Sequence, residues 1–205
     1  MTSATTITEL RSTLLHVPWH GKAPEAGLSI ESKRDIYVLE IETQGGLVGM
    51  SYLMPLRGGL ETIDAAMKEL VAPRIIGRDA TEIEAIWQLL YKNNFWLGRM
   101  GVTVFAQSAV DMALWDIAGK AANLPLHRLL GGAGQMSLPA YASLLKYKDR
   151  DLVAARTKLA IQQGYRHVKL HETEEAEVRA AREAAGPDVK IMVDTNCPWT
   201  PEEAR

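Results

Sequence analysis

The sequence predicts an α+β unit followed by parallel β/α units, and two patterns indicate the change between them. Up to about residue 122, short strand-like segments come first and helical segments follow. After Gly134 the two kinds of segment alternate, with crossovers of about a dozen residues or more, which is typical of parallel strands joined by helices. We therefore expect one domain over residues 1–132 and another over residues 133–205.

The first unit should open with three β-strands. Residues 7–17, 34–43 and 47–53 are strand-like, and apolar side chains alternate with polar ones most clearly in the second of these segments. The sequence Gln44-Gly45-Gly46 separates the second segment from the third, as a hairpin turn would.

Helical periodicity begins at Thr62. Apolar residues recur every three or four positions as far as Pro73, and the same spacing returns over residues 80–91. Residues 102–122 are apolar around the whole circumference of a helix, so this helix should be central. A short helical turn, LHRLLGG at residues 126–132, ends at a glycine pair.

The second unit should contain three strands that alternate with helices. We expect strands over residues 136–144, 165–170 and 189–196, and helices over residues 149–163 and 174–185.

The last residues carry the signals of a helix start. Thr200 suits an N-cap, Pro201 suits the first helical position, and two acidic residues follow. Only Ala204 and Arg205 come after them, and a parallel sheet of three strands would leave a long edge unprotected. We therefore expect the chain to be the N-terminal part of a longer protein.

Composition narrows the classes of function. A formal net charge of -2, without a long basic patch, argues against a nucleic-acid partner. A single cysteine excludes an intramolecular disulfide framework and fits a reducing compartment. The N-terminus lacks a signal-peptide pattern, and no apolar run is long enough to cross a membrane. We expect a cytoplasmic protein with no membrane partner.

Polar side chains gather toward the carboxyl ends of the predicted parallel strands. Residues two apart in a strand share a face, which puts Lys169 with His171 and Asp194 with Asn196. In parallel β/α folds this end of the sheet binds ligands. The first strand adds two more side chains by the same rule, Tyr141 and Ser143.

Two interpretations of this cluster are open from spacing alone. An aspartate beside an amide suits a hard cation such as Mg²⁺, and a lysine near that cation would have its pKa lowered, as a general base needs. Alternatively, Lys169 and Asp194 form a buried ion pair and no metal binds.

Three motifs resemble one family. The segments AVDMALWDIAGKAANLPLHRLLGG (109–132), GYRHVKLH (164–171) and IMVDTN (191–196) are similar to the mandelate racemase and muconate lactonizing enzyme branch of the enolase superfamily. The resemblance implies an α+β capping domain followed by α/β units that form an incomplete (β/α) TIM-type barrel. We also expect a homo-oligomer.

The resemblance also implies roles for individual residues. Asp194 matches the first of three acidic Mg²⁺ ligands, with Asn196 close by. Lys169 matches the first lysine of a Lys-x-Lys motif that polarises or neutralises the substrate carboxylate. His171 replaces the second lysine, and it could either transfer a proton or only donate a hydrogen bond to substrate.

The chemistry implied by the family is removal of the proton α to a carboxylate, which gives an enediolate stabilised by the metal. We expect a small carboxylate substrate and, foremost, dehydration of a hydroxy acid or sugar acid, since one proton abstraction suffices there. Racemization, epimerization or lactonizing cycloisomerization is the alternative, as is a non-catalytic fragment. Capping-domain loops over residues 17–28 and 52–58 would contact substrate or exclude water through three residues: Trp19, His20 and Arg57.

Overall fold

Two compact units make up the part of the chain that the computed structural model describes, which comprises residues 3–18, 33–55, 58–132, 134 and 137–205. One unit contains the described residues up to Gly134, and the other contains those from residue 137 onward.

An antiparallel sheet of three strands opens the first unit. Strands β1 (Ile7–Pro18), β2 (Lys33–Thr43) and β3 (Val48–Leu53) lie in that order, as predicted. Alternate residues of β2 turn to one face, where three side chains are completely buried: Tyr37, Leu39 and Ile41. The predicted hairpin turn joins β2 to β3.

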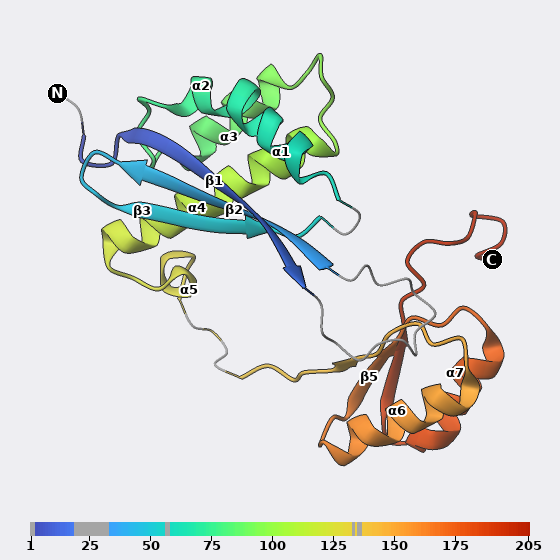
Figure 1. Ribbon diagram of the computed structural model, residues 1–205. Helices are drawn as coiled ribbons and strands as arrows, with labels where there is room; N and C mark the ends of the chain where they lie inside the picture. The colour runs from blue at the N-terminus through green and yellow to red at the C-terminus, as the bar shows by residue number, and fades with distance from the viewer. Residues whose placement is uncertain (1–2, 19–32, 56–57, 133, 135–136) are drawn as a thin grey trace. The chain divides into compact units, whose positions relative to one another are not determined.

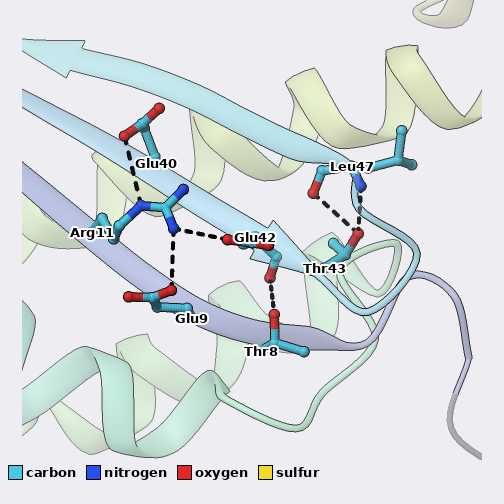
Figure 2. Close-up of polar contacts among 7 residues, drawn as sticks. All are labelled: Thr8, Glu9, Arg11, Glu40, Glu42, Thr43 and Leu47. Carbon is cyan, nitrogen blue, oxygen red and sulfur yellow. Dashed lines mark hydrogen bonds and ion pairs between the residues drawn. The ribbon is translucent and has the colours of Figure 1, made fainter.

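Charged side chains from β1 and β2 contact one another on the opposite face (Figure 2). Arg11 Nη1 lies 3.1 Å from Glu9 Oε2 and 2.8 Å from Glu42 Oε2, while its Nε lies 3.9 Å from Glu40 Oε2. These carboxylates, Glu42 first and then Glu9, raise the pKa of Arg11. Because the pairs are exposed, each contributes little stability.

Helices cover the buried face of the sheet (Figure 1). They are α1 (Leu60–Ala66), α3 (Ile83–Asn93) and the long α4 (Val102–Ala122), followed by the short α5 (Leu126–Leu129). The core of the unit includes six buried residues of α4: Ala106, Ala109, Val110, Ala113, Leu114 and Ile117. The prediction of a central helix over residues 102–122 is therefore confirmed.

The first helical segment does not end at Pro73, contrary to the prediction. A π-helical turn (η2, Met67–Val71) follows α1 and leads into α2 (Ala72–Ile75), which contains the proline. Proline lacks an N–H and so frees a carbonyl one turn earlier. The Arg74 side chain compensates, because its Nη1 donates to Leu70 O at 2.5 Å and to Glu69 O at 3.4 Å.

The second unit is a parallel sheet with helices packed against it, as the alternation predicted. The strands β4 (Ala142–Ser143), β5 (His167–Leu170) and β6 (Lys190–Val193) lie in that order. Helices α6 (Arg150–Gln162) and α7 (Glu175–Ala185) cover one face (Figure 1). The core contains six buried residues: Val153, Ala160, Val168, Leu170, Ala181 and Val189.

Two of the strands are much shorter than predicted. Of the segment expected as a strand over residues 136–144, the structure describes residues 137–144, and these form a strand only at Ala142 and Ser143. Strand β6 ends at Val193 instead of residue 196. Pro139 cannot donate a ladder hydrogen bond, and Asn196 and Cys197 take the left-handed conformation, with φ of 56° and 53°.

The helix start predicted at Thr200 is present as a single turn. Thr200 N–H donates to Glu203 Oε2 at 2.8 Å, and Glu203 N–H donates to Thr200 Oγ1 at 3.3 Å. This reciprocal pair is a capping box, which satisfies two N–H groups that a helix start leaves free. Nowhere in the described ranges is there a helix long and apolar enough to cross a membrane.

Candidate functional site

Three of the predicted site residues come together at the carboxyl ends of β5 and β6. Lys169 lies in β5, His171 follows that strand, and Asp194 follows β6. Lys169 Nζ donates to Asp194 Oδ2 at 3.2 Å, and His171 Nδ1 lies 2.8 Å from the backbone oxygen of Asp194. The strands bring them together because Lys169 pairs with Met192, and Asp194 N–H continues the ladder to Leu170 O at 2.9 Å.

The ion pair of the second interpretation is present, but it is not dry. The Lys169 side chain is 19% exposed and the Asp194 side chain is 44% exposed. The backbone N–H of Asn196, followed by the Lys169 ammonium, holds the pKa of Asp194 below its usual range. The result is an ionised carboxylate that solvent reaches.

The contacts of His171 define which ring nitrogen carries the proton. A backbone oxygen only accepts, so the 2.8 Å contact to Asp194 O requires a proton on Nδ1. The Asn196 amide lies 3.2 Å from the same Nδ1, and rotating this amide by 180° would present its oxygen to the Nδ1 proton. The neutral ring therefore keeps its lone pair on Nε2, and a group held in this way can accept a proton there.

The residues predicted from the first parallel strand, Tyr141 and Ser143, lie near Lys169. Ser143 pairs with Lys169 across β4 and β5, so the two share a face. The Tyr141 ring centroid is 5.5 Å from Lys169 Nζ, within the range of a cation–π contact. The aromatic face therefore lies close enough to contact the lysine side chain.

The capping-loop candidates Trp19, His20 and Arg57 lie outside the residues that the structure describes. Their proposed contact with substrate stays a prediction.

Asp194 suits one position of a hard-cation site. It offers an exposed, ionised carboxylate, and the Asn196 side chain on the same strand end offers an amide oxygen. Within the described ranges, no group of three or more His, Cys, Asp or Glu residues is placed to hold a metal ion. The residues present therefore fit part of a Mg²⁺ site.

The sequence interpretation missed Glu172. Its side chain is only 2% exposed, although it follows His171 directly at the end of β5. Strand parity contained a signal, since Val168, Leu170 and Glu172 fall on the same buried face. A buried carboxylate on an otherwise apolar face is costly unless it is hydrogen-bonded, so it indicates a specific polar partner.

Comparison with known families gives two matches. A family model described as "Mandelate racemase / muconate lactonizing enzyme, N-terminal domain" matches residues 10–131. A second, described as "Enolase C-terminal domain-like", matches residues 151–205.

Curated relatives include sugar-acid dehydratases. The arabinonate dehydratase of Saccharolobus solfataricus is 33% identical over 183 residues, which cover 85% of this chain and 48% of that protein. The D-mannonate dehydratase CC0532 of Caulobacter vibrioides is 36% identical over 137 residues, which cover 67% of this chain and 33% of that protein. The chain thus matches less than half the length of each of these relatives.

Solved structures with the same fold include several enolase-superfamily proteins. One from Agrobacterium tumefaciens aligns with a TM-score of 0.85 at 26% identity, covering 98% of this chain and 57% of that one. A racemase from Streptomyces coelicolor with bound magnesium aligns with a TM-score of 0.82 at 27% identity, covering 97% of this chain and 57% of that one. The 3,6-anhydro-D-galactonate cycloisomerase from Zobellia galactanivorans aligns with a TM-score of 0.78 at 28% identity, covering 97% of this chain and 53% of that one.

Proposed function

The chain belongs to the mandelate racemase and muconate lactonizing enzyme branch of the enolase superfamily, and we propose that it forms part of a Mg²⁺-dependent enzyme. This enzyme would remove the proton α to a carboxylate. The product of this step is an enediolate. We further propose that β4 to β6 with α6 and α7 are the first units of a (β/α) barrel, and that the preceding unit caps it.

One observation carries the proposal: the lone pair of His171 is left on Nε2 beside a lysine and an ionised carboxylate. His171 Nδ1 is committed to the Asp194 backbone oxygen, so Nε2 is the atom that takes or returns the α-proton. Lys169, charged and partly exposed, binds the substrate carboxylate. Asp194 would hold Mg²⁺, which supplies positive charge against the substrate oxygens when it is bound.

Lys169 must change partner for this assignment to work. In the structure its ammonium contacts Asp194 Oδ2, an oxygen of the carboxylate that would hold the cation. A substrate carboxylate offers Lys169 another anion, while Mg²⁺ offers Asp194 another cation. The exposure of Asp194 makes this exchange possible without unpacking the core.

Dehydration of a sugar acid is the favoured reaction. The C2 proton passes to a protein base, the C3 hydroxyl takes a proton from a general acid and departs as water, and the resulting enol tautomerises to a 2-keto-3-deoxy acid. Named relatives at 33% and 36% identity are dehydratases of arabinonate and mannonate, which supports this choice. Racemization or cycloisomerization is the second candidate, because solved structures named for these activities share the fold.

The test uses the 205-residue chain and a version extended through a complete barrel by the remaining sequence of the arabinonate dehydratase relative. Both are incubated with Mg²⁺ and a panel of sugar acids in D₂O. We expect the extended version to form a 2-keto-3-deoxy acid, detected as its semicarbazone and by proton NMR. Deuterium at C2 of recovered substrate, without water loss, would instead favour racemization.

Calorimetric titration with Mg²⁺ tests the metal assignment separately. We expect the extended version to bind Mg²⁺ and its Asp194→Asn variant to bind much more weakly. Equal and negligible binding by the 205-residue chain and the extended version would refute the metalloenzyme proposal and leave a non-catalytic module.

A further inference from the structure

The residue after the proposed catalytic histidine is a buried carboxylate. Glu172 is 2% exposed, and it continues the face of β5 on which Val168 and Leu170 pack under the helices. His171, one residue earlier, turns to the opposite face. A carboxylate on the core side is costly to bury unless its oxygens are hydrogen-bonded.

Glu172 finds its partners in the loop that follows β4. Tyr147 N–H donates to Glu172 Oε1 at 2.6 Å, and Lys148 N–H donates to Oε2 at 3.2 Å and to Oε1 at 3.4 Å. Lys148 has a φ of 56°, a left-handed conformation that a residue with a side chain rarely takes. A second contact joins the same segments, since Lys146 Nζ donates to Thr173 Oγ1 at 3.1 Å.

The chemistry of these contacts requires a carboxylate. Two backbone N–H groups converge on the side chain, and an ionised carboxylate presents only acceptors to them. A glutamine of the same shape keeps one acceptor oxygen, but it places an NH₂ group where Oε2 now accepts from the Lys148 N–H at 3.2 Å. Among the described residues, Glu172 forms no ion pair, so backbone amides alone stabilise its charge.

These contacts fix the strand end that carries His171 from two sides. On one side, Asp194 N–H bonds Leu170 O, and the His171 ring bonds Asp194 O. On the other side, Glu172 bonds the loop of residues 146–148. Losing the Glu172 contacts would leave only the Lys146–Thr173 contact between the loop and residues 171–173, so the imidazole would be held mainly from the β6 side and less firmly in one orientation.

We propose that Glu172 is a positioning residue that holds His171 Nε2 in the orientation needed for proton transfer. The inference rests on the proposed function only in assigning that transfer to His171. The loop after β4 and the end of β5 then move as one body, and Glu172 joins them without touching substrate.

The first experiment needs no activity. Amide hydrogen exchange and ¹⁵N–¹H NMR are recorded for the 205-residue chain, its Glu172→Gln variant and a Val153→Ala control, which weakens the same core without removing a hydrogen bond of Glu172. We expect Glu172→Gln to speed exchange at the Tyr147 and Lys148 amides at least about tenfold and to remove the His171 Nδ1 proton signal that the contact with Asp194 O should protect in the unsubstituted chain. The control should retain both signals.

The second experiment separates positioning from folding in the extended version. We expect Glu172→Gln to lower kcat by about 10- to 100-fold per folded molecule while KM changes less than about threefold, because a misplaced base affects the reacting geometry. Val153→Ala should leave kcat per folded molecule unchanged.

Inactivity of the unsubstituted extended version would count against the proposed function, and the exchange experiment would then decide the role of Glu172. Retention of the His171 Nδ1 proton in Glu172→Gln, its loss in Val153→Ala as well, or an unchanged kcat in folded Glu172→Gln would overturn the inference.

Discussion

Gly49 offers the most direct test of how the first unit is packed. This residue of β3 lies where the sheet meets α4, and a Cβ added to it would be 2.2 Å from the Ala113 backbone oxygen and 2.6 Å from Ile117 Cγ1. The Ile117 side chain could change rotamer, but the Ala113 oxygen moves only if the helix backbone moves. Overpacking usually costs about 1–3 kcal/mol. We expect Gly49→Ala to cost about 3 kcal/mol, because the obstacle is backbone.

Thermal and urea unfolding measure this cost. At roughly 2–4 °C per kcal/mol for a chain of this length, the unit should unfold on the order of 10 °C earlier. Gly134→Ala is the matched control, since a Cβ there meets nothing within 4 Å. A Gly49→Ala transition within about 1 °C of this control would refute the claim that β3 and α4 are in contact at this point.

Three further predictions concern the site and the two cores. In the extended version, His171→Asn should lower kcat more than about tenfold, and an unchanged kcat and pH–rate profile would make His171 a spectator. Burial raises the pKa of Tyr37 to about 12, above its unfolded value of about 10. The folded state therefore keeps the neutral phenol up to a higher pH than the unfolded chain does, so the contribution of Tyr37 to stability is complete below about pH 10 and falls as the pH rises toward 12. The urea midpoints at about pH 9 and about pH 11 should differ more in the unsubstituted chain than in Tyr37→Phe. Asp149 caps α6, because its side chain accepts hydrogen bonds from the Asp151 and Leu152 N–H groups, both at 2.9 Å. Asp149→Ala should therefore destabilise the second unit by about 1 kcal/mol in urea titrations. An unchanged urea midpoint would show that Asp149 has no capping role.

The elements that the sequence predicted well are those whose periodicity reflects burial. The helix over residues 102–122 buries one broad face in the core, and its bounds agree with the structure, although Phe105 and Met112 on its other side are each 43% exposed. The helix that passes through Pro73 was missed because the compensation comes from Arg74, a side chain whose reach no periodic pattern encodes. The two-residue β4 was overextended because apolar residues continue beyond the short stretch that pairs with β5.

The candidate site could be predicted as far as strand parity extends. Parity grouped Lys169 with His171 and placed Asp194 at the neighbouring strand end, and these residues are in contact. Parity could not show that His171 contacts the backbone oxygen of Asp194. This contact lies where the chain leaves β6 and turns into the left-handed conformation at Asn196, and strand parity ends there. It also could not identify the partners of Glu172, which are backbone amides without a sequence signature.

The π-helical turn at Met67–Val71 has a consequence for how this chain tolerates changes in length. Its closing bond runs from the Ala72 N–H to the Met67 oxygen, five residues back, so the turn holds one residue more than a regular helical turn. Removing the solvent-facing Lys68 or Glu69 would let the backbone relax to ordinary α-helical pitch, with Ile63 and Ile75 still facing inward. A one-residue deletion, which elsewhere in a helix would rotate every later side chain by about 100°, has here a site that can absorb it.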